Sequence, residues 1–323
     1  MISRKGVVMK IEDIKRVLIL GAGTMGQQVG LQCAMHGYDV VYYDLSREIL
    51  DNALRRVAKL GSWYASAGRL TEDSLQRVLA RISATPDPAK AAQDVDLVSE
   101  SVPEDPELKG KVFGRFHKLC PERTLFTTNT SMLVPSMFAE ATGRPEKLIA
   151  LHFHDLRTNN IADLMPHPGT DSQVIDLVHA FAKSIGQIVI MLRRENSGYV
   201  FNAMLSSLFS SALSLASRKV AAIEDIDRSW MGVMHTAMGP FGIMDQVGLS
   251  TVWIITDYWA KKTGDAQAQA NADFLKQVVD RGHLGFRTNQ GFYSYPNPAY
   301  AEENFVSKQG PEKKQLPPKP TQP

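Results

Sequence analysis

The chain has 323 residues, and its 44% hydrophobic and 22% charged composition is typical of a globular protein with roughly two domains. The formal net charge of +2 argues against dedicated nucleic-acid binding, which normally uses a clustered basic face. The two cysteines lack disulfide or zinc spacing, and neither a secretory signal nor an apolar run of about 18 residues is present. We therefore expect a cytoplasmic protein with no membrane span, no nucleic-acid partner and no metal.

Residues 16–44 predict a strand, a helix and a second strand, the unit from which dinucleotide-binding domains are built. The apolar run RVLIL leads into GAGTMG at 21–26, the helix continues to Gly37, and an apolar strand covers 38–44. A lone GxGxxG motif is weak evidence, but its position between a strand and a helix makes it specific.

The glycine motif predicts an NAD site. Gly21 permits the tight turn, Gly23 lets a pyrophosphate approach the backbone, and Gly26 allows the helix to pack closely on the strand. Thr24 and Met25 lie at the start of the helix, where free backbone N–H groups favour phosphate binding. The alternative is that these glycines only form a turn.

Asp44 ends the second strand, 18 residues after Gly26. A carboxylate at this position accepts hydrogen bonds from the adenosine ribose and repels a 2′-phosphate, so we expect NAD rather than NADP. Arg47 lies nearby in sequence and weakens this preference. The alternative role for Asp44 is a solvated strand end.

The remaining pattern predicts an N-terminal α/β domain of the doubly wound Rossmann type and an all-α C-terminal domain. Two helices joined by a connector are expected at about 46–82, and Thr71 is a plausible N-cap of the second. Further strands are expected at 94–103, 124–131, 147–153 and 187–192. We therefore expect an NAD-binding domain over 1–194, a helical substrate and dimerisation domain over 195–308, and a disordered tail over 309–323.

His152 ends the apolar strand KLIALHF. Ligands of an open parallel sheet bind outside the carboxyl ends of its strands, where a histidine can exchange a proton with a substrate near neutral pH. Taken alone, a histidine at such a position is more often a hydrogen-bonded structural residue.

Several motifs in a fixed order resemble the 3-hydroxyacyl-CoA dehydrogenase family, over about residues 14–296. The segments that carry the resemblance are GAGTMG at 21–26, ESVPE at 100–104, NTS at 129–131, LHF at 151–153, SGYVFN at 197–202, EDID at 224–227, MGPFGIMDQVGL at 238–249 and GFYSY at 291–295. The GPF and GFY segments are expected to be packing corners without a chemical role.

This resemblance implies roles for several side chains. His152 matches the family's general acid/base, and Asp163 falls where the family usually has a glutamate that orients the imidazole. Aspartate is one methylene shorter, and one residue is missing between the two positions, so its reach to His152 is an open question. The alternative for Asp163 is a surface strand residue. Ser131 and Asn202 match residues that hydrogen-bond the reacting oxygen; their alternatives are a turn or cap role and a helix-face amide.

Three more residues are assigned to the cofactor by the same resemblance. Glu104 and Lys109 match positions that border the nicotinamide ribose, and Asn129 belongs to the NTS motif. The alternative for Glu104 and Lys109 is a solvated pair of charges.

The sequence departs from the family around the catalytic strand, where the usual HFFNP is replaced by HFHDL at 152–156. The extra His154 is expected to be a partly exposed strand-end residue, and the alternative is a second polar contact in the site. The segment NNIADLM resembles diketoreductases of the family, and MPHPGT resembles its lambda-crystallin or gulonate dehydrogenase branch. The hairpin at 58–70 holds Lys59 as its only lysine, although Arg55, Arg56 and Arg69 could meet a CoA phosphate.

Three functions therefore stay open: a dehydrogenase of 3-hydroxyacyl-CoA thioesters in fatty acid metabolism, a dehydrogenase of a free 3-oxo acid, ester or sugar acid, and an NAD-binding protein without catalysis. The small-molecule acyl substrate is the expected partner. A homodimer through the C-terminal domain is also expected, because family members dimerise there and SSLFSSALSLAS is apolar and rich in small residues; the alternative is an internal core helix.

Overall fold

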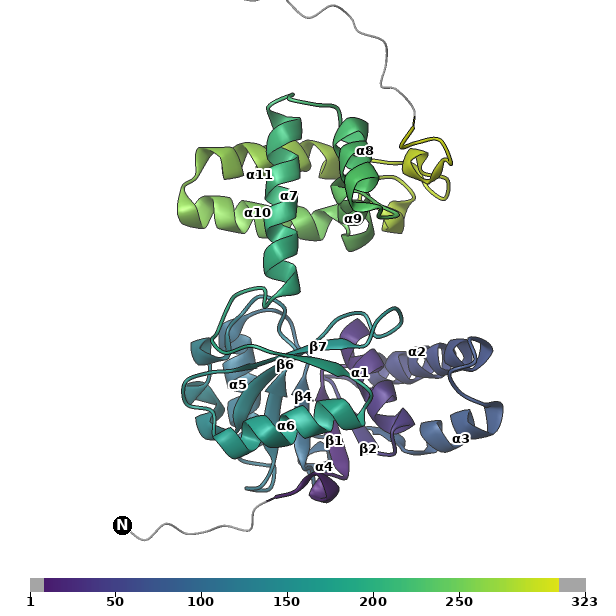
Figure 1. Cartoon of the computed structure of the whole chain (residues 1–323). Coiled ribbons are helices and arrows are strands. Elements are labelled where there is room, and N and C mark those ends of the chain that lie inside the picture. The colour runs from purple at the N-terminus through teal and green to yellow at the C-terminus, as the bar shows by residue number, and fades with distance from the viewer. Residues whose placement is uncertain (1–8, 308–323) are drawn as a thin grey trace, which may run out of the picture. The chain divides into compact units, whose positions relative to one another are not determined.

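The computed structural model describes residues 9–307. These residues form two compact units, and the boundary between them lies between Ala203 and Met204 (Figure 1). The tail expected at 309–323 lies outside the described residues. Short 3-10 helices cover Ile11–Asp13, Pro135–Met137, Glu140–Thr142, Pro145–Lys147, Phe286–Thr288 and Ala299–Ala301.

The first unit is built on a single eight-stranded sheet with the order β3-β2-β1-β4-β5-β6-β7-β8. Its strands are β1 Arg16–Leu20, β2 Asp39–Tyr43, β3 Ile82–Ala84, β4 Leu97–Glu100, β5 Leu125–Thr128, β6 Leu148–Phe153, β7 Ile161–Pro166 and β8 Ile188–Met191. The first six strands are parallel and follow the order of dinucleotide-binding sheets, which confirms the predicted Rossmann-type domain.

Helices cover both faces of this sheet, as the alternation of buried side chains requires. They are α1 Thr24–Met35, α2 Arg47–Ser66, α3 Glu72–Ala80, α4 Pro88–Ala91, α5 Pro106–His117 and α6 Ser172–Ser184. Val17 and Ile19 of β1 share a core with residues of α1, α2 and α6, whereas Leu18 and Leu20 share a core with residues of α4 and α5 (Figure 1). The carboxyl ends of the six parallel strands meet at one edge of the sheet.

Two helices of the first unit form the hairpin expected at 46–82, and Thr71 is the N-cap of the second, as predicted. Its Oγ1 accepts a hydrogen bond from the backbone of Ser74. We expect the connector at 62–70, but it begins later, because α2 continues through Ser66. The chain then adds β3, a strand that the sequence pattern did not indicate.

The strand β7 interrupts the parallel order of the sheet. It runs antiparallel to β6, and β8 runs parallel to β7. The sequence pattern did not separate β7 as an element, because Asp163 interrupts its apolar run. This reversal pairs His152 of β6 directly with Asp163 of β7 in the register.

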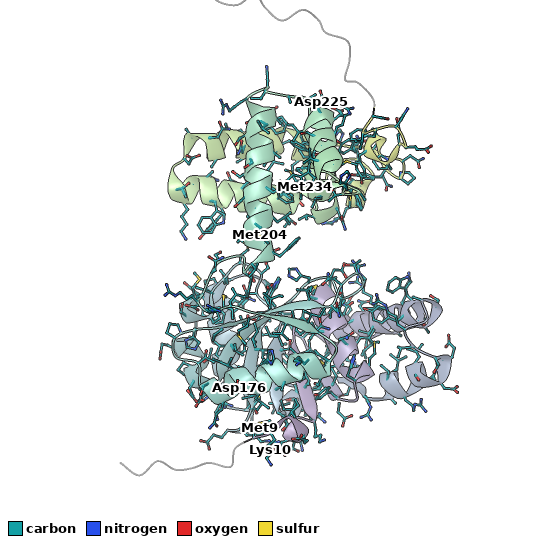
Figure 2. All side chains as sticks on the ribbon, viewed as in Figure 1. Met9, Lys10, Asp176, Met204, Asp225 and Met234 are labelled. Carbon is teal, nitrogen blue, oxygen red and sulfur yellow. The ribbon has the colours of Figure 1, made fainter. Side chains whose placement is uncertain are left out.

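The second unit is helical, as predicted, with α7 Phe201–Ser217 entering it from the first unit, followed by α8 Ile223–Met234, α9 Pro240–Val247, α10 Leu249–Thr263 and α11 Ala266–Val279. Some large apolar side chains of this unit are exposed, including Met204 of α7 and Met234 of α8 (Figure 2). Among the described residues, no helix is long and apolar enough to cross a membrane.

Two buried carboxylates hold the family motifs of the second unit in place. Asp227 accepts hydrogen bonds from the backbone N–H groups of Phe241 and Gly242 and from the Tyr293 hydroxyl, at 2.9 to 3.0 Å. Asp245 accepts them from the backbone N–H groups of Phe292 and Tyr293 and from the hydroxyl of Tyr295. These contacts give the GPF and GFY segments the packing role that was expected for them.

Asp227→Ala should lower the free energy of unfolding by about 3 kcal/mol or more, because it leaves three buried donors unpaired.

Burial raises the pKa of Asp227 to about 6 despite those donors. The stabilising contribution of the carboxyl group is therefore largest in acid and falls as the pH rises through that value, so the loss should be greater near about pH 5 than near about pH 7.5. Urea unfolding at both pH values measures this. Glu224→Ala, an exposed change on the same helix, is the control and should have little effect.

Candidate active site

The glycine motif lies where β1 turns into α1, and its backbone leaves room for a phosphate. Gly21 has a φ of +93°, and a Cβ there would lie 2.7 Å from the carbonyl oxygen of Ser101. A Cβ on Gly26 would lie 2.1 Å from the carbonyl oxygen of Gly21. A Cβ on Gly23, by contrast, would meet no atom within 4 Å, so this position faces open space beside the free N–H groups of the first turn of α1. The motif therefore fits the pyrophosphate of a dinucleotide.

Asp44 follows β2 and connects it to the glycine turn. Its Oδ2 accepts a hydrogen bond from the N–H of Ala22 at 2.8 Å, and its Oδ1 accepts one from the N–H of Leu45 at 2.7 Å. The side chain is half-buried, and each carboxylate oxygen keeps further lone-pair capacity for ribose hydroxyls. The position and chemistry of Asp44 thus fit the adenosine ribose of NAD.

An ion-pair network lies at the ends of β4 and β5, in which Glu100 and Lys109 are buried and the Glu104 side chain is 37% exposed. The Nζ of Lys109 lies 2.7 Å from Glu100 Oε1 and 3.4 Å from Glu104 Oε2. Lys109 is 1% exposed, so it is not the solvated charge considered as an alternative. Burial raises the pKa of Glu100, and Lys109 opposes that effect. Glu100 is a member of this network that the sequence analysis did not select, although it lies in the quoted ESVPE segment.

Glu104 connects the network to the loop that carries Ser131. Its Oε1 accepts hydrogen bonds from Thr130 Oγ1 at 2.5 Å and from the backbone N–H groups of Ser131 and Met132 at 2.9 Å each. Burial would raise the pKa of Glu104, but the ammonium group of Lys109 and these donors outweigh it and hold the pKa below its usual value. Glu104 is therefore an ionised carboxylate that fixes the backbone of Ser131.

Asn129 joins the ends of β5 and β6. Its Oδ1 accepts a hydrogen bond from the backbone N–H of Phe153 at 2.8 Å, next to His152. Asn202 is the second residue of α7 and is half-buried. Cofactor contact by Asn129 and substrate contact by Asn202 stay predictions.

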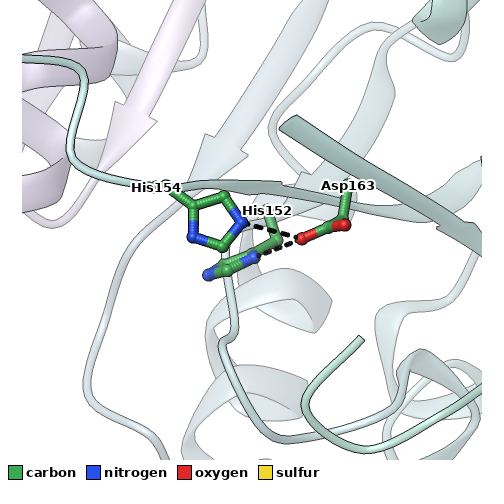
Figure 3. Close-up of side chains that lie close together, drawn as sticks. All are labelled: His152, His154 and Asp163. Carbon is green, nitrogen blue, oxygen red and sulfur yellow. Dashed lines mark hydrogen bonds and ion pairs between the residues drawn. The ribbon is translucent and has the colours of Figure 1, made fainter. Parts of the chain in front are cut away.

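The histidine and the carboxylate predicted to form a catalytic pair lie together at the β6–β7 register (Figure 3). The Nδ1 of His152 lies 3.1 Å from Asp163 Oδ2. Directly opposed residues of adjacent antiparallel strands have Cβ atoms only about 4.5–5.5 Å apart, so a side chain as short as aspartate can reach. The shorter residue and the missing position therefore do not prevent contact with His152.

The protonation of the pair follows from its burial. His152 is 5% exposed, and burial lowers its pKa, an effect that the hydrogen bond to Asp163 only partly offsets. Burial would raise the pKa of Asp163, but hydrogen bonds from His152 and His154 outweigh it and lower the pKa. At neutral pH the site therefore holds an ionised Asp163 and a neutral His152.

Two further aromatic rings surround His152. The Nε2 of His154 lies 3.1 Å from the same Asp163 Oδ2, so one carboxylate oxygen contacts both imidazoles (Figure 3). Tyr199 stacks on His152 with ring centroids 4.7 Å apart and an interplanar angle of 16°. His154 was expected to be partly exposed at the strand end, and its side chain is in fact 15% exposed. Tyr199 was not selected, although it lies in the quoted SGYVFN segment.

The hairpin formed by α2 and α3 directs an arginine at the loop after β6. Arg69 donates hydrogen bonds to the carbonyl oxygens of Leu156 and Arg157, and its guanidinium group lies 5.0 Å from the ring centroid of Tyr64. Arg69 is therefore engaged within the protein, whereas Arg55, Arg56 and Lys59 of the hairpin are exposed.

The comparisons with known proteins agree with this geometry. The model of the 3-hydroxyacyl-CoA dehydrogenase NAD-binding domain matches residues 16–195, and that of the family's C-terminal domain matches 198–295. The chain belongs to the 3-hydroxyacyl-CoA dehydrogenase family. It is an NAD-dependent oxidoreductase of that family, with NAD as the cofactor of its Rossmann-type domain.

Individual relatives align with most of this chain. The mitochondrial hydroxyacyl-coenzyme A dehydrogenase of Homo sapiens is 28% identical over 290 residues, covering 87% of this chain and 91% of that protein. The 3-hydroxybutyryl-CoA dehydrogenase of Clostridioides difficile is 29% identical, and the alignment covers 87% of this chain and 99% of that protein. The solved structure of a diketoreductase, reported to act on dicarbonyl compounds, is 36% identical in sequence with a TM-score of 0.81. The match covers 87% of this chain and 99% of the diketoreductase chain.

The two glycines of the cofactor turn give a paired prediction. Gly23→Ala should fold normally yet weaken NADH binding, because its Cβ enters only the space reserved for the pyrophosphate. Gly26→Ala should lower the free energy of unfolding by about 1–3 kcal/mol or more, because its Cβ meets backbone. NADH fluorescence titration and thermal unfolding measure these effects. Equal losses of stability in both variants would contradict the assignment.

The Tyr199 hydroxyl is buried and has no hydrogen-bond partner among the described residues. Tyr199→Phe removes this cost and keeps the stack on His152, so the free energy of unfolding should stay unchanged or rise by up to about 1–3 kcal/mol. Denaturant unfolding measures it. A clear loss of stability would show that the hydroxyl is paired.

Proposed function

We propose that this protein catalyses the reversible NAD-dependent oxidation of a 3-hydroxyacyl-CoA thioester to its 3-oxo form. The observation that carries the proposal is the hydrogen bond between His152 Nδ1 and Asp163 Oδ2 at the β6–β7 register. The names of the relatives from Homo sapiens and Clostridioides difficile support the substrate class.

His152 would act as the general acid/base. In neutral His152 the ring proton is on Nδ1, which donates a hydrogen bond to ionised Asp163. Nε2 is therefore unprotonated and can accept the proton of the substrate hydroxyl. Asp163 then stabilises the imidazolium that forms, in the manner of the carboxylate of a catalytic triad. When bound, NAD would supply the acceptor for the C3 hydride. In the reverse direction, His152 returns the proton to the carbonyl oxygen as it becomes a hydroxyl.

The residues around this pair would position the substrate and the cofactor. The Ser131 hydroxyl and the Asn202 amide are proposed to hydrogen-bond the reacting oxygen, where charge changes during the reaction. Glu104 fixes the backbone of Ser131 and is proposed to border the nicotinamide ribose with Lys109 and Asn129. Because Lys109 is buried against Glu100 and Glu104, it would act mainly through Glu104.

A second candidate function is the reduction of a free dicarbonyl compound. It is favoured by the 36% identity to the diketoreductase and by Arg69, whose guanidinium group bonds to backbone carbonyls instead of extending toward a CoA phosphate. A sugar-acid substrate fits the same acid/base pair. The hydrogen bond between His152 and Asp163 argues against the third function, an NAD-binding protein without catalysis.

The cytoplasmic location and the homodimer stay predictions. Exposed apolar side chains such as Met204 and Met234 support association through the second unit, and gel filtration at micromolar concentration tests it. A monomer there would reject the dimer.

His152→Gln should lower kcat/KM for the active substrate by on the order of 10²-fold or more, because it removes the acid/base group. NADH binding should be unaffected, which fluorescence titration checks. His179→Gln, a change on α6, is the control and should retain full activity. Unchanged NADH oxidation by His152→Gln would refute the assignment.

The substrate class is tested by steady-state reduction of acetoacetyl-CoA and of a free 3,5-dioxo ester with NADH. A higher kcat/KM for the thioester supports the first function. A higher value for the free ester supports the second. If neither compound is reduced while NADH binds, the proposed activity is wrong.

A further inference from the structure

The two histidines and the aspartate of the site also form a cluster of three side chains that can each offer a metal ligand. His152 and His154 are two residues apart on one extended segment, so their side chains lie on the same face, and Asp163 is opposite His152 on β7. Their ring nitrogens and the carboxylate oxygen all lie within 4.8 Å of one another (Figure 3). We propose that His152, His154 and Asp163 form a site for a divalent transition-metal ion such as Zn²⁺, and that its binding switches off the acid/base histidine.

The distances fit zinc with little rearrangement. Zinc binds imidazole nitrogen and carboxylate oxygen at about 2.0–2.2 Å in a tetrahedron, which places neighbouring ligand atoms roughly 3.3 Å apart. Both histidine nitrogens lie 3.1 Å from Asp163 Oδ2. The ion would replace two hydrogen bonds to one oxygen, and the two imidazole nitrogens would move toward each other by rotation of the rings. Three protein ligands leave the fourth position for water.

The charge and the chemistry of the site also suit such an ion. Among the described residues, the salt bridges of the buried Asp163 carboxylate are those with the two histidines, and none joins it to a lysine or an arginine. A bound cation supplies a positive charge there. Imidazole ligands select Zn²⁺, Cu²⁺ or Ni²⁺, whereas Mg²⁺ and Ca²⁺ require oxygen ligands.

Metal binding and catalysis compete for the same imidazole. The atom of His152 that faces Asp163 is Nδ1, and an ion bound there leaves the ring proton on Nε2. The nitrogen that would accept the substrate proton is then already protonated. Binding needs no redox change: the proton leaves Nδ1 and returns to Nε2 through solvent. This inhibition rests on the proposed function, but the metal site itself does not.

The binding test uses the full chain, treated with EDTA and freed of it, without NAD or substrate. Calorimetry with ZnCl₂ should show one ion per chain at micromolar concentration, and CoCl₂ should give the visible absorption of tetrahedral cobalt. Loss of a ligand in His154→Asn or Asp163→Asn should weaken binding by on the order of 10²-fold or more. His36→Asn, an exposed change on the end of α1, is the matched control and should bind normally.

Three outcomes would overturn the proposed metal site. They are no Zn²⁺ binding at micromolar concentration, binding by His154→Asn and Asp163→Asn as tight as by the His36→Asn control, and Mg²⁺ binding as tight as Zn²⁺ binding. Thermal unfolding and NADH titration show that each variant is folded. If His154→Asn does not fold, His154→Phe, which keeps an aromatic ring beside Phe201, replaces it.

The coupling test measures NADH-dependent reduction at increasing ZnCl₂. Inhibition should follow the same concentration range as binding, be reversed by EDTA, and require higher Zn²⁺ in His154→Asn. Zn²⁺ binding without any turnover of substrate would reject the proposed function and leave the metal site intact. Full activity with the site saturated would reject the switch.

Discussion

The hydrogen bond between His152 and Asp163 is the interaction on which the site depends. A histidine at the end of a parallel strand has no fixed protonation, orientation or partner by itself. The reversal of chain direction at β7 supplies all three, because it places Asp163 opposite His152 in the register. Tyr199 stacks on one side of the imidazole, and His154 contacts the ring edge-on.

The rest of the first unit brings the cofactor turn and this pair to the same edge of the sheet. Gly21 packs against the carbonyl of Ser101, Glu104 binds the backbone of Ser131, and Asn129 binds the backbone of Phe153. Successive strand ends are thus joined by contacts between backbone and side chain. Such contacts fix the positions of the groups that we propose to react, and groups held in place before a reaction are the usual source of electrostatic stabilisation.

The parallel half of the fold could be predicted because its signals are local. Apolar runs that end in glycine or in a charged residue mark β1 and β2, and the position of GAGTMG between strand and helix marks the cofactor turn. The strand β7 was missed because Asp163 breaks its apolar pattern. Tyr199 and Glu100 were missed because their roles depend on contacts between distant segments, which periodicity does not encode.

The contact of Asp163 with His152 could be stated from sequence only as an open question. Its answer depends on strand direction, and a parallel β6–β7 pair would not have given the observed register. The same reasoning explains His154, whose alternation with His152 was visible but whose carboxylate partner was not. The departure from the family pattern at three neighbouring positions, HDL in place of FNP, therefore leaves the contact between His152 and Asp163 in place.

The most direct test of the central claim is the ¹⁵N NMR spectrum of the His152 ring in metal-free protein at neutral pH, assigned by comparison with His152→Gln. The account predicts a neutral ring protonated on Nδ1, with Nε2 bare, and loss of this preference in Asp163→Leu. A ring protonated on Nε2, or one whose spectrum is the same without the Asp163 carboxylate, would contradict it.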